Sequence, residues 1–117
     1  MRILIAEDDE LILKTIEYKL QKEGYEVIIT RNGKDAIETI NNTEVDFIIT
    51  DIMMPFASGT EILTAIKALG KKIPVIMLSS LGQEEVVLDA FALGASDFMV
   101  KPFSPNELIL RIKRFAH

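Results

Sequence analysis

Acidic side chains follow two apolar runs of this sequence. The run at residues 3–6 leads into Glu7 and Asp8, and the run at 47–50 leads into Asp51. Carboxylates held close together repel one another and tend to keep their protons. A divalent cation relieves that repulsion, and Mg²⁺ binds such oxygen ligands while keeping several of its waters. These acids therefore predict a site for Mg²⁺, with Mn²⁺ as the alternative ion.

Hydroxyl groups and an ammonium group follow two further apolar runs. Ser79 and Ser80 come after the run at 75–78, and Lys101 comes after the run at 98–100. A carboxylate such as Asp51 can attack phosphorus and form an acyl phosphate. The metal ion and Lys101 would then neutralise phosphoryl oxygens, and Ser79 would donate a hydrogen bond to another. Together these groups predict phosphoryl transfer to Asp51.

Each of these side chains also has an ordinary structural explanation. Asp9 is a good helix N-cap, an acid or serine at a strand end is usually a turn residue, and a lysine is usually solvated. The combined pattern carries the functional hypothesis, because four separate runs each end in a complementary group.

The elements that position these groups follow from the apolar pattern. The runs are β-branched and nearly continuous, which favours strands of a parallel sheet covered on both faces. Longer amphipathic stretches alternate with them and predict helices. The expected strands are 2–6, 26–30, 46–51, 74–79 and 97–100, and the expected helices are 9–23, 33–42, 59–69, 83–93 and 105–116.

Helix boundaries have their own signals. Leu11, Ile12, Thr15, Ile16 and Leu20 fall at helical spacing, as do Leu108, Ile109, Ile112 and Phe115. Gly24, Gly70 and Gly94 each follow a helical stretch, where a left-handed residue is favoured. Capping boxes are predicted at 58–61 and 104–107, the second with proline at the first helical position.

Alternating strands and helices predict an open, doubly wound α/β sheet with right-handed crossovers. Ligands of such sheets bind at the carboxyl ends of the strands. The acids, hydroxyls and ammonium described above all follow the carboxyl ends of strands. We therefore expect them to share one pocket.

Composition limits the function further. The 117 residues are enough for one domain, spanning 1–117, and contain no cysteine. The formal charge of −5, from 13 basic and 18 acidic residues, argues against nucleic-acid contact by this segment. No apolar run approaches the ~20 residues that cross a bilayer, and the N-terminus becomes acidic too early for a secretory signal. We expect a cytoplasmic protein without a membrane anchor.

Over nearly the whole chain, the sequence resembles the receiver domain of two-component response regulators. The resemblance rests on Ala6-Glu7-Asp8-Asp9, Thr50-Asp51-Ile52-Met53-Met54-Pro55, Pro74-Val75-Ile76-Met77-Leu78-Ser79 and Gly94-Ala95-Ser96-Asp97-Phe98, followed by Val100-Lys101-Pro102-Phe103. It is nearest to receivers of winged-helix transcription factors. It implies a flavodoxin-like, five-stranded parallel sheet in the order 2-1-3-4-5 with five flanking helices.

The resemblance also implies a role for each site residue. A sensor histidine kinase would phosphorylate Asp51, and Glu7, Asp8 and the backbone carbonyl of Met53 would join Asp51 in holding Mg²⁺. Lys101 would bind the phosphoryl group, and the Lys101–Pro102 peptide would be cis. The only reactions implied are the domain's own phosphorylation and dephosphorylation, so it is not expected to be an enzyme otherwise.

Ser79 and Phe98 take the switch positions of the family. The phosphoryl group would draw Ser79 toward it, and Phe98 would then rotate inward. Phe98 replaces a common tyrosine, so this switch would run on packing alone. Met53 and Leu81 are expected to flank the site and to shield the acyl phosphate from water.

The segments 83–93, 97–100 and 105–116 form the expected output face. The resemblance implies a homodimer contact there, through apolar residues with a ring of charged ones, although the apolar members are equally consistent with the core. The predicted dimer residues are Leu88, Phe91, Asp97, Glu107, Leu110 and Arg111. Val87 stands where a basic partner is usual, so one bridge would be missing. The histidine kinase is expected at Leu11, Ile12 and Thr15, unless these are buried.

Three other functions fit the sequence less well. A degenerate receiver that only binds partners is disfavoured, because every expected ligand type is present. A phosphatase of the haloacid type places its nucleophile on the first strand and needs a cap domain. A flavin-binding module would want a Ser/Thr/Gly-rich loop after the first strand, where this chain has acids that repel phosphate.

Overall fold

The computed structural model describes residues 1–54 and 56–115. Strands and helices alternate along the described chain: β1 (Arg2–Ala6), α1 (Glu10–Lys22), β2 (Glu26–Thr30), α2 (Gly33–Asn42), β3 (Phe47–Asp51), α3 (Gly59–Ala68), β4 (Val75–Ser79), α4 (Glu84–Ala92), β5 (Asp97–Val100) and α5 (Pro105–Lys113). The strands form one parallel sheet in the order β2-β1-β3-β4-β5. This confirms the flavodoxin-like architecture.

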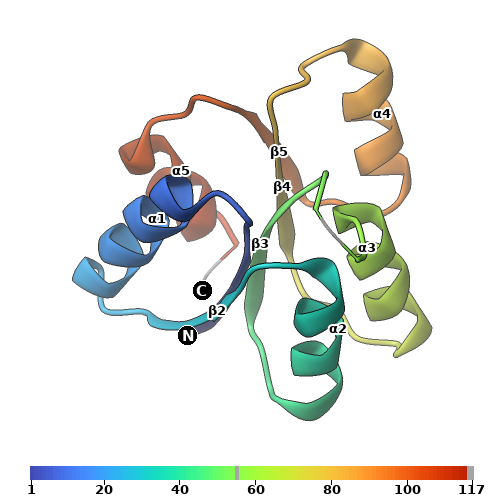
Figure 1. Ribbon diagram of the computed structural model, residues 1–117, viewed down its shortest axis with the longest axis horizontal. Helices are drawn as coiled ribbons and strands as arrows, with labels where there is room; N and C mark the ends of the chain where they lie inside the picture. Colours follow the sequence, from blue (N-terminus) through green and yellow to red (C-terminus); the bar gives the residue numbers. More distant parts are fainter. Residues whose placement is uncertain (55, 116–117) are drawn as a thin grey trace.

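Helices cover both faces of the sheet (Figure 1). α1 and α5 lie on one face, and α2, α3 and α4 lie on the other. Side chains alternate along β1, so that Ile3 and Ile5 pack with α1 and α5 while Leu4 and Ala6 pack in the opposite layer. Since both faces are covered, the strands read as continuous apolar runs.

The predicted boundaries agree closely with the observed ones. Each predicted strand and helix is present, and all but one begin and end within one residue of the prediction. The exception is α5, which ends at Lys113, with residues 114 and 115 in a turn. Residue 116, the predicted end of this helix, lies outside the described residues.

The predicted helix-end signals are present, with one difference. The Asp9 carboxylate accepts hydrogen bonds from the backbone N–H groups of Leu11 (3.0 Å) and Ile12 (3.2 Å), as expected for an N-cap. Ser58 forms a complete capping box with Glu61. Ser104 accepts from the Glu107 N–H, but the Glu107 carboxylate pairs with Arg111, so only half of the second predicted box forms.

The buried face of α1 decides between two alternatives that the sequence left open for Leu11 and Thr15. Leu13, Ile16 and Leu20 are buried, whereas the Leu11 side chain is 79% exposed and Thr15 is exposed. The alternative in which Leu11 and Thr15 are buried is therefore wrong. Residues 11–13 are all apolar, so the sequence alone did not fix which of them begins the buried stripe. Leu11 is therefore available on the surface beside the site.

The described helices include none that is long and apolar enough to cross a membrane.

Candidate functional site

The candidate site lies at the carboxyl edge of the sheet. Backbone hydrogen bonds continue the strand pairing one residue beyond the strands. The Glu7 N–H donates to the Thr30 carbonyl (3.2 Å), and the Lys101 N–H donates to the Ser79 carbonyl (2.7 Å). These bonds fix the backbone at Glu7 and Lys101, so their side chains start from well-defined positions.

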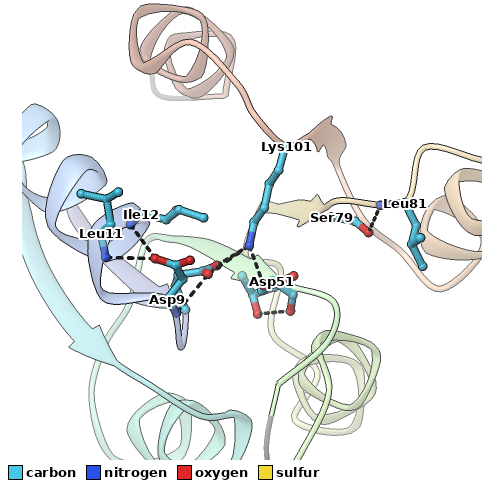
Figure 2. Close-up of polar contacts among 9 residues, drawn as sticks. Asp9, Leu11, Ile12, Asp51, Ser79, Leu81 and Lys101 are labelled. Atoms are coloured by element: carbon cyan, nitrogen blue, oxygen red, sulfur yellow. Dashed lines mark hydrogen bonds and ion pairs between the residues drawn. The ribbon is translucent and has the colours of Figure 1, made fainter.

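The Lys101 side chain reaches Glu7, which follows β1, and Asp51, which ends β3. Its Nζ lies 2.7 Å from Asp51 Oδ2, and 3.0 Å and 3.1 Å from the two carboxylate oxygens of Glu7. Figure 2 shows the Lys101 side chain extending from the end of β5 toward Asp51. Glu7 is fully buried, and the side chains of Asp51 and Lys101 are 11% and 15% exposed. The three residues form a buried ion-pair cluster.

Asp8 completes an acidic group that fits a divalent cation. One carboxylate oxygen each from Glu7, Asp8 and Asp51 can be chosen so that all lie within 4.8 Å of one another. Asp8 is exposed, which leaves the group open to water. Three oxygen ligands with room for water are what Mg²⁺ prefers. The residues present therefore fit the predicted ion.

The charge states of the cluster follow from its burial. Burial raises the pKa of Glu7 to about 7, and the nearby Asp51 carboxylate adds to this rise, while Lys101 opposes it. Burial lowers the pKa of Lys101, but its hydrogen bonds to Asp51 and Glu7 outweigh that effect and raise it. Lys101 is therefore protonated at neutral pH, and Glu7 changes charge near neutrality.

Ser79 ends β4 at this edge, and Phe98 lies earlier along the neighbouring strand β5, opposite Met77. The Ser79 side chain is buried, and its Oγ accepts a hydrogen bond from the Leu81 N–H at 2.9 Å (Figure 2). Phe98 is 8% exposed and packs in the layer beneath α4. The inward rotation of Phe98 that would follow movement of Ser79 stays a prediction.

The loop from β3 to α3 carries the remaining predicted residue of the metal site. Met53 lies two residues beyond Asp51, and its side chain is 69% exposed. Leu81, 45% exposed, lies in the loop after β4. Figure 2 shows Leu81 next to Ser79. The metal-binding role of the Met53 carbonyl stays a prediction.

The apolar side chains predicted for the output face are exposed. Leu88, Phe91 and Leu110 are 58%, 43% and 66% exposed, so the alternative that they belong to the core is wrong. The charged residues pair within the chain, since Arg111 contacts Asp97 Oδ1 at 2.8 Å and Glu107 Oε1 at 2.9 Å. A ring of ion pairs between two chains would form only if Arg111 left these partners in its own chain for acidic residues of the other chain.

Sequence reasoning missed two features of the site. The pairing of Lys101 with Glu7 was not expected. A largely apolar groove of about 460 Å³ also runs beside the cluster, lined by Leu11, Ile12, Thr15, Ser80, Lys101, Pro102, Phe103 and Pro105. The partner contact was expected at Leu11, Ile12 and Thr15, which form one wall of this groove. The residues of the opposite wall were not predicted to take part. The apolar residues 102–103, which follow a buried strand, were the one signal in the sequence that could have indicated this wall.

The Lys101–Pro102 peptide is cis, as the resemblance implied.

A parallel α/β sheet with acids and a lysine at its carboxyl edge is the arrangement that the resemblance implied. The family model described as the response regulator receiver domain matches residues 3–113, and the chain belongs to this family. It is thus a receiver domain of the two-component type.

Known relatives agree with this assignment. The chain is 43% identical over 112 residues to the uncharacterized transcriptional regulatory protein YbdJ of Bacillus subtilis, covering 96% of this chain and 49% of YbdJ. It spans about half the length of the curated relatives it matches. The receiver domain of Francisella response regulator 1452 superposes with a TM-score of 0.92 at 33% identity, covering 97% and 94% of the two chains. The receiver domain of the Pseudomonas aeruginosa sensor histidine kinase PA1611, described with a magnesium ion in its active-site cleft, gives 0.88 at 27% identity, covering 97% and 95%.

Proposed function

We propose that Asp51 accepts a phosphoryl group from a sensor histidine kinase in a Mg²⁺-dependent reaction. The modified domain then changes its α4–β5–α5 face and controls an output domain or partner of the transcriptional kind. The observation that carries this proposal is the position of Asp51, bonded to Lys101 and adjacent to Glu7 and Asp8. The description of YbdJ as a transcriptional regulatory protein supports the kind of output.

The chemistry assigns one task to each side chain. An Asp51 carboxylate oxygen attacks phosphorus, the phosphorus–nitrogen bond of the donor histidine breaks, and an acyl phosphate forms. When bound by Glu7, Asp8, Asp51 and the Met53 carbonyl, Mg²⁺ supplies positive charge to the phosphoryl oxygens. Lys101 releases Asp51 and binds a phosphoryl oxygen, and the Ser79 hydroxyl donates to another. Loss of the Ser79–Leu81 bond couples the pocket to the loop before α4.

The direct test is incubation with acetyl phosphate and Mg²⁺, followed by measurement of intact mass. The chain is expected to gain one phosphoryl group, and EDTA is expected to prevent the gain. An unchanged mass in the presence of Mg²⁺ would contradict the proposal.

The groove beside α1 is the proposed docking place for the kinase. Leu11 projects into solvent at its rim, and Phe103 and Pro105 form the opposite wall. Lys101 belongs to both the groove and the ion-pair cluster. A helix seated there would bring its phosphohistidine to Asp51.

Mg²⁺ affinity is expected to rise with pH. A cation displaces the proton that Glu7 holds below its pKa of about 7, so binding is weakened wherever Glu7 is protonated. The dissociation constant should be roughly tenfold larger near pH 6 than near pH 8. Isothermal titration calorimetry in two buffers of different ionisation enthalpy measures both the affinity and the released proton. Glu7→Gln should abolish the proton release; an equal release from this variant would assign the proton to another group.

The same pKa shift affects the stability of the metal-free protein. The folded protein holds a proton on Glu7 that the unfolded chain, with its ordinary pKa of 4.5, releases. The free energy of unfolding therefore falls as pH rises from 4.5 to about 7 through this group alone.

The exposed side chains of Met53 and Leu81 are expected to lengthen the life of the acyl phosphate. Both flank the proposed position of the phosphoryl group, where apolar atoms keep attacking water away. The double variant Met53→Asn, Leu81→Lys should lose the phosphoryl group roughly tenfold faster, which corresponds to about 1.4 kcal/mol in the barrier. Decay of phosphoprotein after removal of acetyl phosphate measures this. A half-life equal to or longer than that of the wild type would remove the shielding role.

A weak two-fold dimer is expected through α4, β5 and α5. Leu88, Phe91 and Leu110 supply an exposed apolar surface, and an isologous contact would bury it. Beryllofluoride, which mimics the phosphoryl group, should strengthen the dimer. Sedimentation velocity with and without beryllofluoride measures the association, with Leu88→Lys as the disrupting variant. A monomer under both conditions would count against this surface.

A further inference from the structure

The first turn of α2 lies against the loop that follows Asp51. Gly33 is the first residue of α2 and is buried. A Cβ at this position would lie 1.9 Å from the carbonyl oxygen of Ala57 and 2.5 Å from its carbonyl carbon. Both are backbone atoms, so no side-chain rotation can make room. Glycine is therefore required for this close approach.

The loop itself is fixed mainly at its two ends. The Ile52 N–H donates to the Leu78 carbonyl at 3.0 Å, and the Gly59 N–H donates to the Ile52 carbonyl at 2.9 Å. The hydrogen bonds among the described residues include none made by residues 53, 54, 56 or 57. Ala57 is only 7% exposed, so packing holds the middle of the loop. The contact with Gly33 is part of that packing.

α2 is better anchored than the loop. Asn32 caps it by accepting from the Asp35 N–H at 2.8 Å, and its amide donates to the Asp35 carboxylate at 3.0 Å. Ala36 and Ile40 are fully buried one and two turns further on. An added methyl group at Gly33 would therefore displace the loop in preference to the helix.

We propose that Gly33 is a positioning residue for the metal site, acting through the 52–58 loop. The inference rests on the proposed function, in which the Met53 carbonyl of this loop is a Mg²⁺ ligand. A Cβ at residue 33 must increase its separation from the Ala57 oxygen from 1.9 Å to at least 3.0 Å. Mg²⁺ demands near-octahedral ligands at about 2.1 Å, so a displacement of this size removes or distorts the carbonyl ligand. Gly33 itself touches neither the metal nor the phosphoryl group.

The test compares Gly33→Ala with Ala36→Gly, which weakens the same helix without adding an atom next to the Ala57 carbonyl. Calorimetric titration with Mg²⁺ is expected to show at least a tenfold weaker dissociation constant for Gly33→Ala and an unchanged one for Ala36→Gly. Amide chemical shifts of residues 52–54 and 56–58 in metal-free protein should move in Gly33→Ala and stay in place in the control. The same Mg²⁺ affinity in both variants would overturn the proposal.

Two further measurements separate a failure of the Gly33 proposal from a folding defect and from a failure of the proposed function. If Gly33→Ala is unfolded in buffer alone, it is measured beside the wild type in trimethylamine N-oxide, which strengthens apolar burial and favours the folded state. A wild-type affinity for Mg²⁺ under these conditions would also overturn the proposal. Wild-type protein that binds no Mg²⁺ would defeat the proposed function and the role of Gly33 together. Normal wild-type binding with an unaffected Gly33→Ala would defeat the role of Gly33 alone.

Discussion

Asp51→Asn is expected to gain no phosphoryl group from acetyl phosphate under conditions in which the wild-type chain gains one. The side-chain amide has nearly the same shape as the carboxylate, but it is not a nucleophile and cannot form an acyl phosphate. The variant also loses the charge that pairs with Lys101 at 2.7 Å. Intact mass after incubation with Mg²⁺ and acetyl phosphate measures the outcome directly.

Asp46→Asn is the matched control, because Asp46 precedes the other end of β3. Its carboxylate accepts from the Arg2 N–H at 2.8 Å, far along the strand from the site. This variant should be phosphorylated like the wild type. Phosphorylation of Asp51→Asn to the wild-type extent would place the acceptor elsewhere, and peptide mapping would then locate it.

Lys101→Met is expected to lower the free energy of unfolding of the metal-free protein by about 3 kcal/mol near pH 8. Removing the ammonium leaves the Asp51 and Glu7 carboxylates buried together without a counter-charge. Glu7 can partly relieve this by keeping its proton, so the loss should be smaller below its pKa of about 7 and larger above it. Mg²⁺ should restore part of the stability. Urea unfolding at several pH values, with EDTA or Mg²⁺, measures these effects.

Lys113→Met separates this effect from the general loss of a surface charge. Lys113 lies 3.5 Å from Glu23, and these side chains are 56% and 30% exposed. Such a pair contributes little, so the change should stay within about 0.5 kcal/mol at any pH. Equal losses in the two variants would mean that the buried cluster contributes no more than a surface pair.

The fold could be predicted because local and global signals agree along the chain. β1, β2 and β5 begin and end where the apolar pattern places them, and the glycines expected after helices have positive φ angles, such as 107° at Gly94. The grouping of acids and Lys101 followed from one rule, that the carboxyl ends of parallel strands share an edge.

The remaining details depend on contacts that no local pattern encodes. Leu11 and Leu13 are chemically alike, and only packing against the sheet decides that Leu13 is buried. The Glu7–Lys101 bond depends on side-chain reach across the sheet. Gly33 resembles any helix-starting glycine until the backbone of Ala57 is seen beside it.

The wide sequence separation within the ion-pair cluster has a consequence for protein synthesis. Lys101 contacts Glu7, which lies 94 residues earlier in the chain, and Asp51, which lies 50 residues earlier. A nascent chain that has exposed β1 and β3 outside the ribosome has the acids but not the ammonium that holds them together. Prematurely terminated products ending before residue 101 would lack it permanently. Such products also lack α5 and its buried residues Leu108, Ile109 and Ile112, so they should be unable to build the cluster described here.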